Sequence, residues 1–250
     1  MLDAIILCGG RGTRLNSVLS DCPKPLAPVL GKPFLDYLIS YLATSGMVRA
    51  VTLAIHHMSD RFIEHYATHV PPLPIRFVRE PRPYGTGGAL MNALSANDSE
   101  TVLCLNGDSI VGCDLAKLVA AHRKFQTGVT LALVAVENTE RYGRVVCDDT
   151  GQILSFSEKS ASAGPGLINA GVYVIDKSTL GPWDGEVLSM ETDILPRLAR
   201  EGRLHGIRVK GPFIDIGMPE TYAAAGDFLR GFTMAEGSVD RSKHRMNSTP

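Results

Sequence analysis

The sequence lacks three features that would each mark a particular class of protein. No apolar stretch reaches the roughly 18 residues that a membrane-spanning helix needs, and no basic leader with a long apolar core precedes the first strand-like run. Nor does either sign of charge dominate, since 25 Lys and Arg against 26 Asp and Glu give a formal net charge of −1 at pH 7. We therefore expect no membrane partner, no nucleic-acid partner and a cytoplasmic location.

Cysteine is also scarce, and its five positions form no C-x-x-C pair. They are Cys8, Cys22, Cys104, Cys113 and Cys147. An odd, scattered set of cysteines is typical of free thiols in a reducing compartment and argues against a disulfide framework or a zinc site. Cys8 and Cys104 lie inside apolar runs, so we expect both to be buried.

Strand-like and helix-like segments alternate through about the first 136 residues, after which short strands follow one another. Strands are predicted at Ala4–Cys8, Val51–Ile55, Ile75–Val78, Thr101–Leu105, Val129–Val136, Arg144–Cys147, Ile153–Phe156 and Gly171–Ile175. Helices are predicted at Phe34–Ser45, Asp60–His69, Gly88–Ser95, Leu115–Phe125, Met190–Arg200 and Glu220–Phe232. This order predicts an α/β fold, Rossmann-like, with a mixed, mainly parallel sheet and helices on both faces.

The later strands are expected to form a mixed lobe against the same core. We therefore predict one domain over residues 1–232, which is within the range of a single α/β domain. The segment Gly237–Pro250 is polar and without periodicity, so a disordered tail is predicted there.

A glycine-rich loop follows the first predicted strand directly, in the segment Leu7–Leu15 (LCGGRGTRL). In an open α/β sheet, ligands bind beyond the carboxyl ends of the strands, which is where this loop falls. Its glycines can expose successive N–H groups to phosphate oxygens, and Arg11 and Arg14 add positive charge. Neither the G-x-x-x-x-G-K-[ST] loop nor the G-x-G-x-x-G loop is present, because Leu15 stands where the third glycine of the latter belongs. Taken alone, the segment could also be a plain tight turn.

A lysine between two prolines follows ten residues after Arg14, in Pro23-Lys24-Pro25. Both prolines restrict the backbone, so Lys24 is expected to be held in place and not to lie in any helix. The lysine is thus a candidate cation held toward a phosphate, although a surface loop is an alternative.

Two carboxylates follow predicted strands and are candidate ligands of Mg²⁺. Asp108 ends the strand Thr101–Leu105 through Asn106-Gly107-Asp108, and Asp215 lies in Phe213–Gly217, which is predicted to be another short apolar strand ending in glycine. Two carboxylates, phosphate oxygens and water would complete the six oxygen ligands that magnesium prefers. A turn or a strand end is the structural alternative for each.

The segments Gly9–Leu15 (GGRGTRL) and Pro23–Pro25 together resemble the signature of the sugar-1-phosphate nucleotidyltransferase family, in residue types and in spacing. Cys8 stands where many members have alanine. The resemblance covers residues 2–230 and implies the GT-A-like nucleotidyltransferase fold. It also implies a magnesium-dependent reaction in which a sugar 1-phosphate attacks the α-phosphorus of a nucleoside triphosphate and pyrophosphate leaves.

The resemblance implies a role for each matching position. Arg14, Lys24 and Lys159 would be catalytic, and Asp108 and Asp215 would hold the metal. The predicted nucleotide-binding residues are Leu7, Cys8, Gly9, Gly10, Arg11, Gly12, Thr13, Tyr84, Gly85, Thr86, Gly87, Gly88 and Asp108. The predicted sugar-binding residues are Asn106, Gly143, Glu158, Lys159, Asn169 and Glu191.

Within the family, the chain resembles in particular the guanylyltransferases that act on D-glycero-α-D-manno-heptose 1-phosphate. The shared segments are Ile6–Leu15, Pro23–Pro28, Lys32–Leu35, Gly85–Ala89 and Leu105–Asp108. This implies GTP and a GDP-heptose product for surface polysaccharide synthesis. The sequence does not determine the oligomeric state, and a homo-oligomer is one possibility. Mannose-1-phosphate guanylyltransferases and uridylyl- or thymidylyltransferases acting on N-acetylmuramate or glucose 1-phosphate are alternatives within the family. A catalytically silent sugar-nucleotide sensor and a dinucleotide-dependent oxidoreductase are the alternatives outside it.

Overall fold

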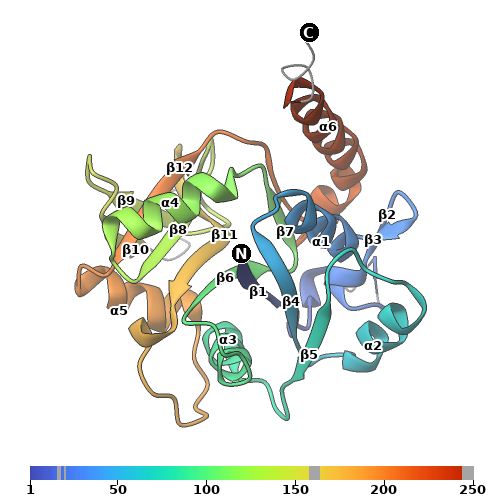
Figure 1. The fold of residues 1–250 in the computed structure, drawn as a ribbon, viewed down its shortest axis with the longest axis horizontal. Helices are drawn as coiled ribbons and strands as arrows, with labels where there is room; N and C mark the ends of the chain where they lie inside the picture. Colours follow the sequence, from blue (N-terminus) through green and yellow to red (C-terminus); the bar gives the residue numbers. More distant parts are fainter. Residues whose placement is uncertain (16–17, 20, 158–163, 244–250) are drawn as a thin grey trace, which may run out of the picture.

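The computed structural model describes residues 1–250 except 16–17, 20, 158–163 and 244–250. Its largest sheet has the strand order β10-β9-β11-β6-β1-β4-β5, and β8 and β12 continue it from β11 (Figure 1). Its strands are β1 (Leu2–Leu7), β4 (Val48–Ile55), β5 (Ile75–Arg79), β6 (Thr101–Asn106), β8 (Val129–Val136), β9 (Arg144–Cys147), β10 (Ile153–Ser157), β11 (Gly166–Asp176) and β12 (Leu204–Val209). The pairs β1–β4, β1–β6, β4–β5 and β8–β12 are parallel, and β11 runs antiparallel to β6 and β8. The predicted mixed, mainly parallel sheet is confirmed.

Strand β1 shows why this sheet is covered on both sides. Ala4, Ile6 and Cys8 belong to one cluster of buried residues, and Ile5 belongs to a second cluster on the opposite face. Because successive side chains of a strand point to opposite faces of the sheet, a strand that is apolar throughout must be covered on both faces. The run AIILC therefore specifies a central strand.

Helices supply the two covers. On one face lie α1 (Phe34–Thr44), α4 (Leu115–Phe125) and α6 (Pro219–Lys243), and on the other lie α3 (Gly85–Ser95) and α5 (Leu195–Arg200) (Figure 1). Helix α2 (Ser59–Thr68) packs Phe62 into the first cluster, and a π-helical turn at Met190–Ile194 leads into α5. None of the described helices combines the length and apolar composition that crossing a bilayer requires.

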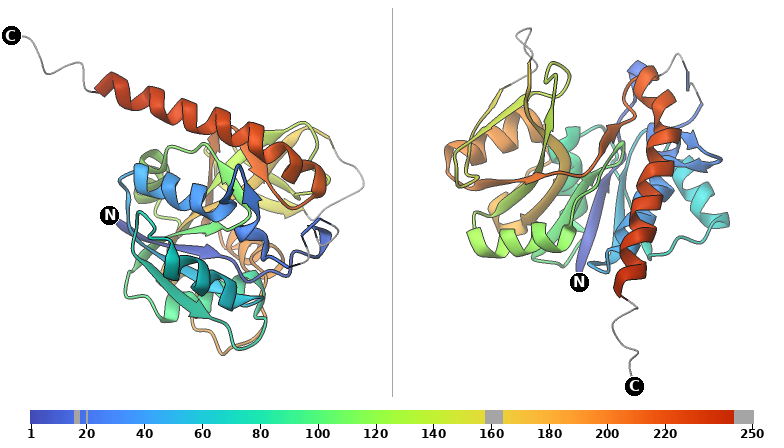
Figure 2. Two further views of the ribbon diagram at one scale, coloured as in Figure 1. Left: turned by 90° about the vertical axis from the view of Figure 1, so that its right-hand side faces the viewer. Right: turned by 90° about the horizontal axis from the view of Figure 1, so that it is seen from above.

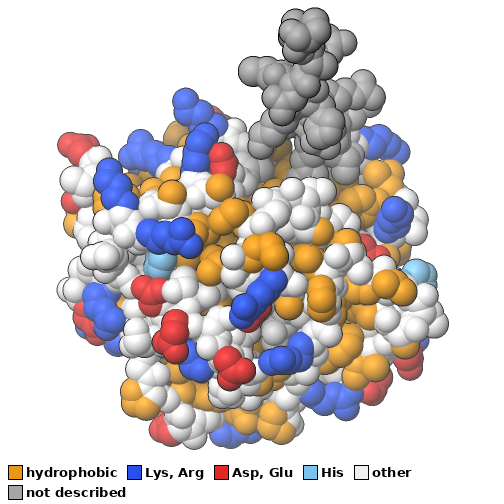
Figure 3. Space-filling view, viewed as in Figure 1, with side chains coloured by type: hydrophobic (Ala, Val, Ile, Leu, Met, Phe, Trp, Pro, Cys, Tyr) orange, Lys and Arg blue, Asp and Glu red, His pale blue; other side chains and the backbone are white. Residues whose placement is uncertain are grey.

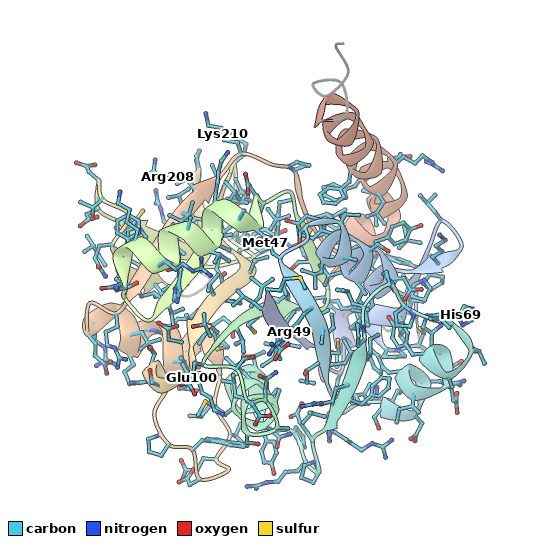
Figure 4. The ribbon with its side chains drawn as sticks, in the orientation of Figure 1. Met47, Arg49, His69, Glu100, Arg208 and Lys210 are labelled. Carbon is cyan, nitrogen blue, oxygen red and sulfur yellow. The ribbon has the colours of Figure 1, made fainter. Side chains whose placement is uncertain are left out.

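The N-terminal ends of β1 and β4 face the viewer in Figure 1, so their carboxyl ends lie at the far side of the molecule, as the rotated views confirm (Figure 2). On the near face, basic and acidic side chains are interspersed (Figure 3). Arg49 lies on this face near the start of β4 (Figure 4). Glu100, Arg208 and Lys210 lie at separate places in the same view (Figure 4).

Two small two-stranded sheets complete the fold. The sequence predicted only one strand of the first sheet. Strand β7 (Ser109–Val111) pairs antiparallel with β13 (Phe213–Asp215), and β2 (Pro28–Val29) pairs with β3 (Lys32–Pro33). The stretch at Phe213 was expected to be a strand, but its partner β7 was not. Pairing between segments about a hundred residues apart leaves no local pattern in the sequence.

Helix α6 continues to Lys243, although the sequence predicts a disordered tail from Gly237. A single glycine costs a helix only about 1 kcal/mol relative to alanine, so Gly237 does not end it. Residues 244–250 of the predicted tail lie outside the described residues. Residues of the lobe formed by β8–β12 belong to the same two buried clusters as the first half. One domain over residues 1–232 stays a prediction.

Candidate active site

A cavity of about 740 Å³ opens beyond the carboxyl ends of β1 and β6. Ten predicted site residues line it, namely Gly12, Thr13, Arg14, Lys24, Asn106, Asp108, Gly143, Asn169, Glu191 and Asp215. The carboxyl edge of an open α/β sheet is the ordinary place for a ligand, because the loops that leave parallel strands meet there. Residues from both halves of the chain thus share one cavity, as the sequence predicts.

The two candidate metal ligands are brought together by the β7–β13 pair. In its register Asp215 stands opposite Ser109, the residue after Asp108, and the Ile216 N–H donates to the Asp108 carbonyl over 2.9 Å. A Cβ built on Gly217 would stand 2.7 Å from Asp215 Oδ1 and 3.1 Å from Lys24 Nζ, so glycine leaves this corner of the cavity open. Two strands therefore hold both carboxylates at one wall.

Lys24 is fixed against the first of these carboxylates. Its Nζ lies 2.6 Å from Asp108 Oδ2, and the two side chains are 15% and 36% exposed. The lysine begins a 3-10 turn, Lys24–Leu26, whose Pro25 and Leu26 are buried. The expectation that the prolines exclude any helix at Lys24 is thus wrong, because proline is tolerated in the first turn.

The glycine loop reaches the cavity through its second half only. Gly12 has φ +59°, and a Cβ on it would stand 3.3 Å from the Lys24 Cβ. A side chain at this position would be strained and would press on the lysine. Thr13 and Arg14 are exposed and line the cavity, and Leu15 is buried and anchors the loop. Gly9, Gly10 and Arg11 do not line it.

The backbone at Leu7 and Cys8 already has partners inside the fold. The Cys8 N–H donates to the Ala54 carbonyl over 2.8 Å, and the Leu7 carbonyl accepts from Gly107 over 3.0 Å. Burial raises the pKa of the Cys8 thiol well above its ordinary value, and nearby Asp108 raises it further. Cys8 is therefore a neutral packing residue, and its N–H is not available to a ligand.

The segment Tyr84–Gly88 is similarly engaged and lies outside the cavity lining. The Gly87 and Gly88 N–H groups both donate to the Leu188 carbonyl, over 2.8 and 3.1 Å, and the Leu188 N–H donates to Tyr84. Gly85 has φ +75°, and a Cβ there would stand 2.4 Å from the Leu188 carbonyl oxygen. These glycines hold the loop before the π-helical turn, so nucleotide contacts from their N–H groups stay a prediction that this geometry does not favour.

One residue of that segment does connect to the cavity. Thr86 Oγ1 donates to Glu191 Oε2 over 3.0 Å and accepts from the Met190 N–H over 2.8 Å. Glu191 also accepts from the Ser189 hydroxyl over 3.2 Å. Thr86 therefore orients a carboxylate that lines the cavity.

Three of the predicted sugar-binding residues, Asn106, Gly143 and Asn169, lie on β6, directly before β9 and on β11, and line one wall of the cavity. Asn169 accepts from the Gly171 N–H over 3.0 Å and donates to the buried Tyr173 hydroxyl over 2.6 Å, so its amide is oriented. Asn106 lies against Gly171, where a Cβ would stand 2.7 Å from its Nδ2. Glu158 and Lys159 lie outside the described residues, and their roles stay predictions.

Two residues at Asp215 were missed by the sequence analysis. Arg141 Nη2 lies 3.2 Å from Asp215 Oδ1, and the Tyr142 hydroxyl donates to Oδ2. Burial raises the pKa of the Tyr142 hydroxyl and its hydrogen bond to Asp215 raises it further, so the hydroxyl stays protonated. Their position just before Gly143 was the only signal in the sequence.

A buried carboxylate at the same sheet edge was also missed. Glu80 directly follows β5 and is 5% exposed. Its Oε2 accepts from the Tyr84 N–H over 3.0 Å, and a Cβ on Gly9 would stand 2.6 Å from Oε1. Burial raises the pKa of this carboxyl, and the Tyr84 hydrogen bond opposes the effect. A glutamate embedded beside the glycine loop is costly to bury, which makes it a candidate ligand contact.

The donors at the Asp108–Asp215 wall suit a divalent cation. Carboxylate oxygens are the ligands that hard cations prefer, and phosphate oxygens and water can fill the other positions. Within the described part of the chain, no group of three or more His, Cys, Asp or Glu side chains could hold a metal. The two aspartates thus fit a site in which the protein supplies a minority of the ligands.

Comparison with known proteins identifies the family. Residues 3–230 match the model of the Nucleotidyl transferase family. A D-glycero-alpha-D-manno-heptose 1-phosphate guanylyltransferase from Aneurinibacillus thermoaerophilus is 36% identical over 232 residues, which cover 92% of this chain and 100% of that protein. An enzyme of the same name from Campylobacter jejuni is 34% identical and covers 88% of this chain and 97% of its own length.

A solved structure shows the same fold. HddC from Yersinia pseudotuberculosis, in a crystal structure complexed with GMP-PN, is similar with a TM-score of 0.80 and 32% identity, over 92% of this chain and 100% of that one. The family match, the full-length relatives and the shared fold confirm the resemblance read from the glycine loop and the Pro-Lys-Pro segment. The chain belongs to the nucleotidyl transferase family.

Proposed function

We propose that this protein transfers GMP from GTP to D-glycero-α-D-manno-heptose 1-phosphate. A non-bridging oxygen of the sugar phosphate forms a bond to the α-phosphorus of GTP. The bond from that phosphorus to the oxygen bridging to the β-phosphate breaks, and pyrophosphate leaves with the electron pair. The products are a GDP-heptose and pyrophosphate, in a compartment that holds both substrates, which we take to be the cytoplasm.

One observation carries the proposal. Arg14 and Lys24 from the nucleotide half of the chain and Asn169 and Glu191 from the sugar half line the same cavity. The attacking group is already an anion at neutral pH, so the reaction needs no strong base. Its main obstacle is repulsion between two phosphates, and fixed cations lower that barrier.

Mg²⁺ is the proposed metal, with Asp108 and Asp215 as its protein ligands. When bound, such a cation neutralises charge that develops on the transferring phosphate. Lys24 is positioned by its contact with Asp108, and Arg14 is exposed toward the cavity. Lys159 is the proposed cation for the phosphate of the sugar.

Glu80 supports guanine as the base. An ionised carboxylate is an acceptor with two oxygens, and the Watson–Crick edge of guanine presents two adjacent donors, N1–H and N2–H. Uracil and thymine present one N–H between two carbonyls, and adenine presents no such pair. Glu80 and Gly9 lie outside the lining of the cavity, and Oε1 of the buried Glu80 faces Gly9 at the start of the glycine loop, so a base that reached this loop would meet an acceptor.

The sugar is proposed from the relatives and from the polar groups on the sugar-side wall. Glu191 and the Asn169 amide offer hydrogen bonds whose pairing differs between manno and gluco hydroxyl orientations. Mannose 1-phosphate presents the same ring hydroxyls as the heptose, and it is therefore the main competing acceptor.

The test is a grid of pyrophosphate release. GTP, UTP, dTTP and ATP are each combined with the 1-phosphates of the heptose, mannose, glucose and N-acetylmuramate. We expect GTP with the heptose to give the largest kcat/KM. A preference of about tenfold or more for UTP or dTTP would overturn the guanylyl assignment. A preference of that size for mannose 1-phosphate over the heptose 1-phosphate would overturn the heptose as the acceptor. Binding without turnover in every combination would favour a sensor.

A further inference from the structure

Asp215 is surrounded by donors from a segment to which no catalytic role has been given. Arg141 Nη2 lies 3.2 Å from Oδ1 and 3.4 Å from Oδ2, and the Tyr142 hydroxyl donates to Oδ2. The Gly217 N–H donates to Oδ1 over 2.9 Å. Both oxygens of this carboxylate are thus occupied by the protein itself.

The guanidinium is held in place by neighbours and is still open to the cavity. Its carbon lies 5.4 Å from the centre of the Tyr142 ring, and that ring packs edge-on against Phe213 with 5.7 Å between ring centres. The Arg141 side chain is 39% exposed, against 16% for Asp215. Arg141 can therefore turn away from the carboxylate without unpacking the core.

The pairing at Asp215 has a counterpart at Asp108, which is bound by Lys24. Each carboxylate of the proposed metal site carries one cationic side chain, so the wall is electrically balanced before any ion arrives. A divalent cation added to this wall must compete with two cations for the same oxygens. If the metal ion displaces Lys24 or Arg141 from its carboxylate, the N–H donors of that side chain are left unpaired at the cavity.

We propose that Arg141 is the resident counter-ion of Asp215, that it competes with the divalent cation for this carboxylate, and that once released it binds the phosphate of the acceptor. The second part rests on the proposed function. Arg141 comes from the connection between β8 and β9, two residues before Gly143, and shares the cavity lining with Asn169. It stands on the sugar side of the cavity, where a planar guanidinium can bind a phosphate through two N–H groups.

The first experiment needs no substrate. Mn²⁺ binding to the full chain is measured by calorimetry and by electron paramagnetic resonance for the wild type, Arg141→Ala and Arg144→Ala. Arg144 is the matched control, because it is exposed, donates to the Pro165 carbonyl and does not line the cavity. Loss of a partly exposed ion pair predicts Mn²⁺ binding about two- to fivefold tighter in Arg141→Ala, with Arg144→Ala unchanged. Unchanged or weaker Mn²⁺ binding in Arg141→Ala would show that Arg141 does not compete with the divalent cation for Asp215.

The second experiment tests the released arginine. At saturating metal, Arg141→Ala should raise the KM for the sugar 1-phosphate by about tenfold or more, as loss of a charged hydrogen bond does, and should leave the KM for the triphosphate within about twofold. The acceptor is whichever sugar 1-phosphate proves best in the grid, so a wrong sugar does not affect the outcome. An unchanged KM for the sugar 1-phosphate in Arg141→Ala would show that Arg141 does not bind the phosphate of the acceptor. Arg141→Gln, which keeps the length without the charge, repeats both measurements if Arg141→Ala is poorly folded.

Discussion

The ammonium group of Lys24 lies 2.6 Å from the carboxylate of Asp108, a residue 84 positions away in the chain. This contact joins the Pro-Lys-Pro segment to the end of β6. Its consequence is that the proposed metal ligand and the proposed phosphate-binding cation position each other, so a change to either side chain should affect the other.

Replacing either proposed metal ligand should remove activity and leave the protein folded. Asp108→Asn and Asp215→Asn should each lower kcat by about 100-fold or more, since a carboxylate that organises a metal-assisted transfer supplies several kcal/mol at the transition state. Asp227→Asn, whose side chain is 90% exposed on α6, is the control. Steady-state kinetics at limiting and saturating Mg²⁺ would measure the effect, with circular dichroism for folding. Near-normal activity of Asp215→Asn at limiting Mg²⁺ would contradict the two-carboxylate site.

Gly217→Ala should disturb the same site without removing a charge. The added methyl would stand 2.7 Å from Asp215 Oδ1 and 3.1 Å from Lys24 Nζ, so both groups must move. A shift of this kind predicts a loss of about tenfold or more in kcat/KM. Gly231→Ala on α6, where a Cβ would meet nothing within 4 Å, should be active. Equal activity of the two variants would show that the corner beside Gly217 is not used.

Arg14 and Lys159 should affect different substrates. Arg14→Ala is expected to weaken binding of the triphosphate, and Lys159→Ala binding of the sugar 1-phosphate, because they match different phosphate contacts of the family. Each lost charged hydrogen bond predicts a weakening of about tenfold or more. Titration of each variant with each substrate gives four affinities. An unchanged sugar-phosphate affinity in Lys159→Ala would remove that residue from the site.

Glu80→Gln should change selectivity more than rate. The amide keeps the shape of the side chain but replaces one acceptor oxygen with a donor, which would face a donor of guanine. An unpaired polar group costs about 1–3 kcal/mol, so the preference for GTP over UTP should fall by about tenfold. Glu64→Gln, an exposed position on α2, is the control. Competition between equal concentrations of GTP and UTP would measure this preference. An unaltered ratio of the two products in Glu80→Gln would exclude Glu80 from base recognition.

The start of β1 predicts an acid-sensitive contribution to stability, far from the cavity. The Arg49 side chain donates to Asp3 and lowers the pKa of that carboxyl, burial opposes this effect, and the Ser99 hydroxyl lowers the pKa further, to about 2. The carboxyl is a stronger acid in the folded state, so its contribution is present above pH 3.8 and is lost as the pH falls through about 2.

Asp3→Asn should therefore lower the free energy of unfolding at pH 7 by about 1–2 kcal/mol, a value reduced for the exposure of Arg49. Chemical denaturation of both proteins between pH 7 and pH 2 would show their stabilities converging as the pH falls. A difference that stayed constant over this range would mean that the ion pair is not its source.

The sequence predicted most of the elements and the residues of the cavity, and its errors have physical causes. Apolar runs such as Ala4–Cys8 predict strands because a doubly buried strand has no other composition. Strand β11 was predicted only from Gly171, yet it begins at Gly166. Gly171 has φ +74°, and the register of β11 against β8 shifts between Asn169 and Tyr173, which breaks the pattern.

Arg141 and Glu80 were not predicted because their importance comes from neighbours that are distant in sequence. Nothing in the segment around Arg141 indicates that Asp215 will lie beside it. Glu80 follows an exposed-looking strand, and its burial depends on Gly9 and Tyr84. The motif residues could be predicted, and the residues that complete them required the fold.

The β7–β13 pair also sets the time at which this protein can become active. A nascent chain that ends before Phe213 already contains the glycine loop, Lys24 and Asp108, but it lacks β13 and therefore the second carboxylate. During synthesis the cavity lacks one of its two proposed metal ligands until Phe213–Asp215 has been made. On the proposed function, a chain that ends before Phe213 cannot assemble the two-carboxylate wall, although it already holds the glycine loop.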